Sequence, residues 1–68
     1  MNKPILTYDS RGESGNIFWI LAQVRRILQR ERRLEEYNGL QDRVFRATSY
    51  EKALEEIGKV VELVDTAK

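Results

Sequence analysis

One periodic pattern constrains the fold of this chain more than any other feature. Between positions 15 and 33, apolar residues recur at the three- and four-residue spacing that places them on one side of an α-helix. They are Ile17, Ile20, Leu21, Val24, Ile27 and Leu28. The pattern predicts an amphipathic helix over 15–33, with Ser14 as its N-cap, whose apolar side must be covered by the rest of the chain.

Two further helices are predicted after the first. A helix over 34–46 would carry Glu35 and Glu36 in its first turn, although Gly39 inside it costs about 1 kcal/mol relative to alanine. Its expected inner face is formed by Leu34, Tyr37, Gln41, Val44 and Phe45, with Leu40 at the margin. A capping box over 48–51, with Thr48 as the cap and Glu51 reaching back, predicts a third helix over 49–62. Its expected inner face is formed by Tyr50, Ala53, Leu54, Ile57, Val61 and Val64.

The two ends of the chain have strand character. Residues 4–8 favour a short strand, which needs a pairing partner because a lone strand leaves its backbone groups unsatisfied. The end of the third helix is ambiguous, since Gly58 can also terminate it and leave the valine-rich residues 59–64 to form a strand. The partner of the first strand is either this C-terminal segment or a second copy of the chain. We therefore expect a mainly α, three-helix domain with a short N-terminal strand.

Composition limits the function more than it limits the fold. The 68 residues suit one small domain with a modest core, so homodimerisation is an open possibility. The chain has no cysteine and no histidine, which removes the usual nucleophile–base pairs, the usual general base and the commonest zinc ligands. A fold of this size also offers little room for a substrate pocket. We expect no catalytic residues, no metal, no cofactor and no small-molecule substrate.

The segment between the strand and the first helix requires a separate interpretation. Gly12 and Gly15 flank Glu13 and Ser14, and a glycine loop before a helix N-terminus is a layout that binds phosphate groups. No lysine follows the second glycine, and Glu13 repels anions, so the pattern of a P-loop is incomplete. A structural turn is the preferred interpretation, and a weak anion site is the alternative.

The outer side of the first predicted helix carries the candidate binding site. Five of the eight arginines lie between positions 25 and 33, and a helical projection places the single tryptophan on the same side as three of them. The candidate partner-binding residues are Trp19, Gln23, Arg26, Arg30 and Arg33. Tryptophan and arginine are enriched at the centres of protein interfaces, although a packed tryptophan beside solvated arginines is the simpler alternative.

Charge is segregated along the chain even though its net value is only +1. Residues 16–33 contain five arginines and one glutamate, a balance of +4, whereas residues 49–65 contain five acids and two lysines, a balance of −3. The two regions could pair within the fold or between copies. The longest apolar run, residues 17–22, is far too short to span a membrane, and no signal-peptide pattern opens the chain, so we expect a cytoplasmic protein.

Two short motifs resemble a known family. Residues 14–19 read Ser-Gly-Asn-Ile-Phe-Trp before the arginine-rich helix, and residues 48–51 read Thr-Ser-Tyr-Glu at the start of the third helix. Both are similar to motifs in a family of small proteins of bacteria, phages and other mobile elements that has no known function. The resemblance implies a bacterial or phage cytoplasm and an accessory role in host interaction.

Two functional hypotheses follow from these observations. The first is a non-catalytic protein-interaction module, with a protein partner or a second copy bound at the outer side of the first helix. The second is a nucleic-acid-binding accessory protein, in which five arginines contact phosphates. These arginines are Arg25, Arg26, Arg30, Arg32 and Arg33.

Overall fold

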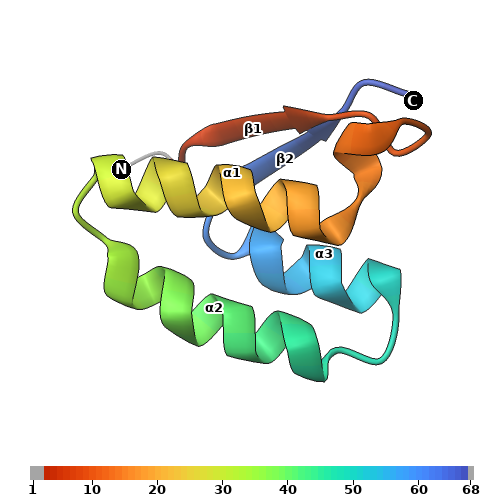
Figure 1. The fold of residues 1–68 in the computed structure, drawn as a ribbon. Coiled ribbons are helices and arrows are strands. Elements are labelled where there is room, and N and C mark those ends of the chain that lie inside the picture. The colour runs from red at the N-terminus through yellow and green to blue at the C-terminus, as the bar shows by residue number, and fades with distance from the viewer. Residues whose placement is uncertain (1–2, 68) are drawn as a thin grey trace.

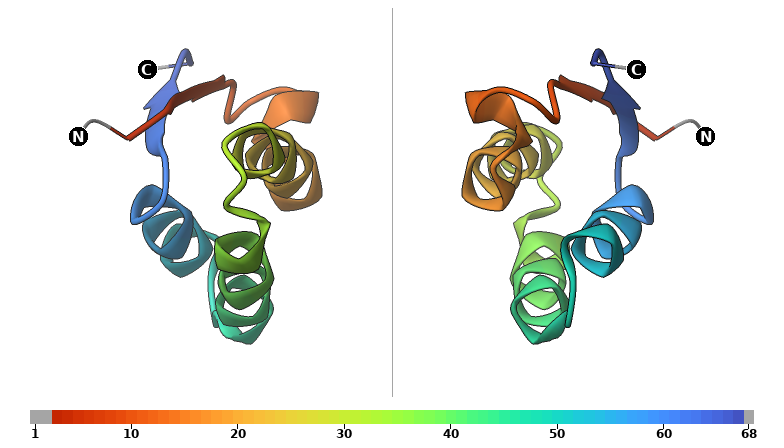
Figure 2. Two further views of the ribbon diagram at one scale, coloured as in Figure 1. Left: turned by 90° about the vertical axis from the view of Figure 1, so that its left-hand side faces the viewer. Right: turned by 90° about the vertical axis from the view of Figure 1, so that its right-hand side faces the viewer.

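The chain folds into three helices and a two-stranded sheet, which confirms the mainly α class. A computed structural model describes residues 3–67. The elements follow in the order β1 (Ile5–Tyr8), a 3₁₀ turn η1 (Glu13–Gly15), α1 (Ile17–Arg30), α2 (Leu34–Arg46), α3 (Tyr50–Gly58) and β2 (Glu62–Asp65). The sheet lies on one side of the molecule and α2 on the opposite side, with α1 and α3 between them (Figures 1 and 2).

The N-terminal strand finds its partner within the same chain. Strand β1 pairs in parallel with β2, and Ile5 lies opposite Glu62 while Tyr8 lies opposite Asp65. The third helix therefore ends at Gly58 rather than continuing to residue 62, and the C-terminal segment takes the strand alternative. Helix α1 packs against β1 and α3 packs against β2. A sheet thus closes over the helices, although its two strands come from opposite ends of the chain.

The core is formed by β1, the three helices and the segment between α3 and β2, with Leu63 of β2 packed against it. Six of its larger side chains are almost completely buried, namely Ile20, Val24, Leu28, Leu40, Ile57 and Val61. Three of these side chains, Ile20, Val24 and Leu28, belong to the apolar stripe that the sequence predicts for α1. Burying apolar side chains in this way contributes the main stabilising free energy of a small domain, at about 25 cal/mol per Å².

Helix α2 occupies the predicted range, and the glycine at position 39 does not interrupt it. Its predicted inner face was partly wrong. Leu40, placed at the margin, is fully buried, whereas Phe45 is 58% exposed and Leu34 is also exposed. The physical reason is that α2 lies far from the sheet, so only α1 and α3 cover it and its buried side is narrow. Two predicted inner residues of the third region, Tyr50 and Val64, are likewise exposed.

The helix caps lie one or two residues later than predicted. Asn16, not Ser14, caps α1, because its side-chain oxygen accepts from the backbone N–H of Phe18 at 2.8 Å. Ser49, not Thr48, caps α3 by accepting from the N–H of Lys52 at 3.1 Å. Ser14 lies in η1, and its hydroxyl instead accepts from the N–H of Asp9 in the preceding loop, at 2.8 Å. Each cap still satisfies a backbone donor that a helix start leaves free.

The glycine loop is a structural turn. The N–H groups of Gly12 and Gly15 donate within the loop, to the carbonyls of Asp9 and Gly12 respectively, each at 3.0 Å. Gly15 is buried, and its carbonyl accepts from the Tyr50 hydroxyl at 2.6 Å. Because the two glycine amides already have partners inside the loop, they are not directed at an anion, and the structural interpretation of this segment holds.

Candidate protein-binding surface on α1

Four of the candidate residues lie on the solvent side of one helix, α1. They are Trp19, Gln23, Arg26 and Arg30. Trp19 is 37% exposed, Gln23 is half-buried, and Arg26 and Arg30 are exposed. Successive residues of a helix are rotated by about 100° around its axis, so positions 19, 23, 26 and 30 fall on one side, away from the buried stripe. Four of the five predicted residues therefore share one surface.

The fifth predicted residue, Arg33, does not belong to this surface. Helix α1 ends at Arg30, so the stacking expected over three turns stops before position 33. Arg33 lies in the α1–α2 turn and forms ion pairs with Glu31, at 2.9 Å, and with Glu36. The hydrogen bond to Glu36, and next that to Glu31, raises the pKa of the Arg33 guanidinium above its usual value. The side chain of Arg33 is therefore bound by acidic residues of the α1–α2 turn and the start of α2.

The early end of α1 has a local cause. The N–H of Arg33 donates to the Leu28 carbonyl at 2.7 Å, and the N–H of Arg32 donates to the Gln29 carbonyl at 3.1 Å. Arg32 itself adopts a left-handed backbone conformation, with φ of 59°. These are the bonds of a Schellman motif, which terminates a helix and satisfies its last carbonyls. An arginine occupies the position that usually holds glycine, which explains why sequence inspection missed this helix end.

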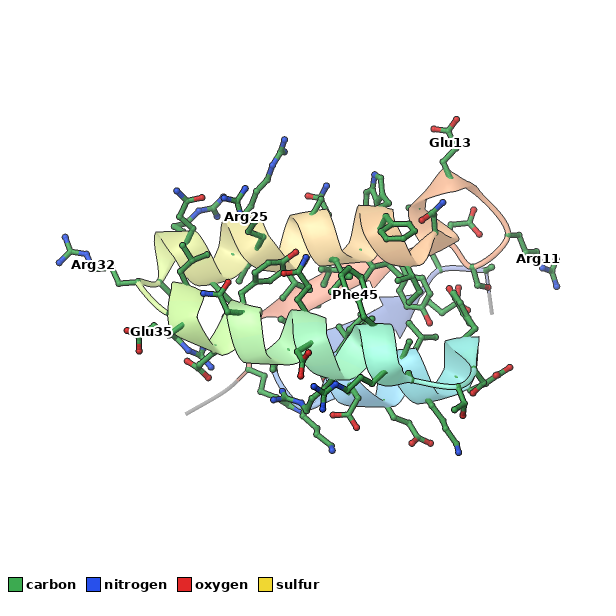
Figure 3. All side chains as sticks on the ribbon, turned by 60° about the horizontal axis from the view of Figure 1, so that its bottom comes forward. Arg11, Glu13, Arg25, Arg32, Glu35 and Phe45 are labelled. Atoms are coloured by element: carbon green, nitrogen blue, oxygen red, sulfur yellow. The ribbon has the colours of Figure 1, made fainter. Side chains whose placement is uncertain are left out.

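Three arginines lie exposed on α1. Among residues 3–67, no carboxylate forms an ion pair with Arg25, Arg26 or Arg30. Unlike Arg33 and Arg43, these guanidinium groups are free to meet an external carboxylate or phosphate. Figure 3 shows Arg25 on α1 and Arg32 projecting from the turn at the end of that helix.

Sequence reasoning missed an exposed aromatic pair beside this surface. The rings of Phe18 on α1 and Phe45 on α2 lie 6.2 Å apart between centroids and are tilted by 56°. Such a geometry is favourable for aromatic pairs, yet Phe18 is 69% exposed and Phe45 is 58% exposed. Phe45 lies between the two helices in Figure 3. The sequence does indicate that Phe18 is exposed, because the same helical projection places it on the solvent side of α1 with Ala22 and Arg25.

Open hollows also lie elsewhere on the surface. One, of about 370 Å³, lies between the end of α2 and α3, and another, of about 450 Å³, lies at the α1–α2 turn. In the first, Arg43 and Lys59 both pair with Glu56, at 3.0 and 3.1 Å. The hydrogen bond from Lys59, and then that from Arg43, lowers the pKa of Glu56 below its usual value. Glu56, which lines this hollow, therefore already has two basic partners within the chain.

Within residues 3–67, no cluster of three or more acidic residues has a geometry suited to a metal ion. No helix in the same range has the length and apolarity required to cross a membrane.

Comparisons with known proteins leave the surface without a precedent. No family model matches the chain, and no curated protein and no solved structure is significantly similar to it.

Proposed function

We propose that this protein is a non-catalytic interaction module that binds another protein through the solvent side of α1 and the adjacent end of α2. One observation carries the proposal. An exposed Phe18–Phe45 pair lies on the same helix pair as arginines that form no ion pair with residues 3–67. Aromatic residues and arginine are the types that contribute most to protein interfaces, where rings anchor in apolar pockets and guanidinium groups pair with carboxylates.

The sequence resemblance supplies the setting of this proposal. It is consistent with an accessory module in the cytoplasm of a bacterium or of a phage-infected cell. The partner surface would have to be acidic and partly apolar, because it must complement both the arginines and the rings.

Capture experiments with matched variants test the proposal. The double variant Phe18→Ser, Phe45→Ser removes two exposed rings, and Arg26→Glu reverses a charge that has no partner in residues 3–67. Both variants should keep the helical circular dichroism of the native chain and lose the proteins that the native chain retains. Lys52→Glu on α3 changes the net charge by the same amount as Arg26→Glu and serves as the control. Equal capture by all four chains would refute the proposal.

A second function is favoured by one specific observation. Arg25, Arg26 and Arg30 carry no ion pair with residues 3–67, and arginines of this kind can contact phosphates. Nucleic-acid binding would weaken steeply as salt rises, and Trp19 fluorescence would report it. A flat titration with duplex and single-stranded DNA at low salt would exclude this alternative.

A further inference from the structure

One edge of the sheet is open. The N–H of Glu62 donates to the Pro4 carbonyl at 2.7 Å, and the N–H of Thr66 donates to the Tyr8 carbonyl at 2.8 Å. In a parallel ladder, these bonds direct the backbone groups of even-numbered β1 residues toward β2. The N–H and C=O groups of Ile5 and Thr7 therefore point the other way, and no residue within 3–67 forms a hydrogen bond with them.

The open edge lies on the side of the sheet that α1 supports. Helix α1 packs against β1, and α3 packs against β2, so the edge of β1 that faces away from β2 belongs to the α1 half of the sheet. Phe18 contacts α2 and thereby identifies the flank of α1 that faces α2. On a helical projection Gln23 and Arg30 lie on the opposite flank, with Trp19 and Arg26 between, which places the predicted residues next to the open edge. The half-burial of Gln23 agrees with this placement.

The outer face of the sheet is also uncovered and partly apolar. Ile5 is 63% exposed and Val64 is 41% exposed, while the alternate residues Leu6 and Tyr8 are buried against the helices. Parallel sheets usually have both faces covered, so a two-stranded one with an exposed face and an open edge is unusual. Exposed edges of this kind are where extended segments add to a sheet.

We propose that the open edge of β1 binds an extended, acidic segment of another protein, which adds to the sheet as a third strand. Its backbone pairs with the N–H and C=O groups of Ile5 and Thr7. Side chains alternate along a strand, so every second one faces α1, and these are acidic and meet Arg26 and Arg30. The others are apolar and lie beside Ile5 on the outer face. This inference rests on the proposed function and names the chemistry of the partner.

Charge decides between this partner and a second copy of the chain. Two copies joined antiparallel through β1 would bring their α1 helices together across a two-fold axis. Arg26 and Arg30 of one copy would then lie near the same residues of the other, and like charges in an interface are unfavourable. An acidic strand at the same edge would instead place carboxylates beside Arg26 and Arg30, which is favourable.

Three synthetic peptides test the inference. The first alternates glutamate with valine, the second replaces each glutamate with lysine, and the third is the glutamate peptide N-methylated at every residue, which leaves no N–H donor on either edge of the strand. We expect the first alone to bind and to slow amide hydrogen exchange at Ile5 and Thr7. Leu6 and Tyr8, whose amides face β2, serve as the internal reference.

Variants of the chain sharpen the same experiment. Thr7→Pro removes the backbone N–H of residue 7, which points away from β2, whereas Thr7→Ala keeps this N–H. Only Thr7→Pro should therefore abolish binding of the glutamate peptide. Arg26→Glu combined with Arg30→Glu should weaken binding of the glutamate peptide by about tenfold or more. If Thr7→Pro fails to fold, the N-methylated peptide still tests the role of the backbone.

The possible failures are distinguishable from failure of the proposed function. Binding of the glutamate peptide without protection of Ile5 and Thr7 overturns strand addition and leaves binding at α1 in place. Protection of these amides that rises with protein concentration and needs no peptide overturns the acidic partner in favour of a second copy. No binding of the glutamate peptide at millimolar concentration overturns the inference, whereas capture that depends on Phe18, Phe45 and Arg26 would still uphold the proposed function.

Discussion

The segments before and after α1 solve the same problem, a change of chain direction, in opposite ways. Before α1, the buried Gly15 packs against the backbone of Asp9 and Ser10 and accepts a hydrogen bond from Tyr50 of α3. After α1, the chain turns through bonds between near neighbours, with Arg32 in a left-handed conformation. The first segment is specified by tertiary contacts and the second by local ones. Mutations in the two should therefore act on stability through different mechanisms.

The largest effect is expected from Gly15→Ala. A Cβ at this position would lie 2.7 Å from the Asp9 carbonyl oxygen and 2.8 Å from the Ser10 Cα, both of which are backbone atoms. Relieving these contacts requires the loop to move, and we expect a loss of about 2–3 kcal/mol in the free energy of unfolding. Urea denaturation measures it.

Gly39→Ala in α2 provides the matched control for that substitution. There a Cβ would meet only the end of the Arg43 side chain, at 3.4 Å, and alanine favours a helix over glycine by about 1 kcal/mol. The two glycine substitutions should therefore have opposite signs. Equal loss in both would show that Gly15 is not specifically constrained.

Tyr50→Phe should have the next largest effect. It removes the hydroxyl that donates to the Gly15 carbonyl and leaves that acceptor without its partner, which costs about 1 kcal/mol. The loss should appear in thermal or urea unfolding at neutral pH. An unchanged unfolding midpoint would mean that α3 does not hold the loop through this bond.

The same variant alters stability at high pH. Burial, and then the Asp65 carboxylate, raises the pKa of Tyr50 above its usual value of 10.0, and the same two causes raise the pKa of Tyr8. The folded state therefore holds these protons at a pH where the unfolded chain has released them, so stability falls as pH rises above 10.0. Tyr50→Phe should make that decline shallower without abolishing it, because Tyr8 remains.

Arg32→Gly tests the segment after α1 and should be stabilising. A left-handed conformation costs a non-glycine residue about 1–2 kcal/mol, and glycine gives part of this back through its greater freedom in the unfolded chain. We expect a net gain of about 0.5–1 kcal/mol. Arg30→Gly, two residues earlier and in helical conformation, should instead lose stability. A loss in both would show that the side chain of Arg32, and not its backbone, matters at this turn.

The smallest effect concerns the ion pair at this turn. The hydrogen bond from Arg33 lowers the pKa of Glu36 below its usual value, so the contribution of this pair is lost as pH falls through the pKa of the folded state. Arg33→Gln should move the pKa of Glu36 back toward its usual value in an NMR titration. The unfolding midpoint at neutral pH should hardly change, since exposed ion pairs contribute little. A large shift in that midpoint would contradict the view that this turn is held by its backbone.

Periodicity alone predicted the elements that depend on local sequence. The apolar stripe located α1, and α2 occupies the predicted range. The helix ends were less predictable, because several polar residues near each end can serve as the cap. Ser14 was used by Asp9 instead, and this choice depends on how the loop packs. Whether residues 59–64 formed a strand depended on β1 lying beside them, which no local pattern encodes.

The candidate surface was predictable in part for a similar reason. The helical projection placed Trp19, Gln23, Arg26 and Arg30 on one side of α1, but it assumed that the helix continued to Arg33. The Phe18–Phe45 pair required knowledge of how α1 and α2 pack, since each ring belongs to a different helix. Phe45 follows the buried Val44 at the end of α2, and the sequence pattern predicted that both would be buried. Only α1 and α3 pack against α2, so its buried side is too narrow to include Phe45.

The parallel pairing of β1 and β2 has a consequence for the order of folding. Ile5 and Glu62 are 57 positions apart (62 − 5), so the sheet can close only after nearly the whole chain has been brought together. The helices form through near neighbours and can precede it. A ligand strand that requires a closed sheet would bind only the fraction of molecules in which closure is complete, and binding would in turn draw the remaining molecules to the closed state. The sheet thus makes recognition and the last step of folding a single linked equilibrium.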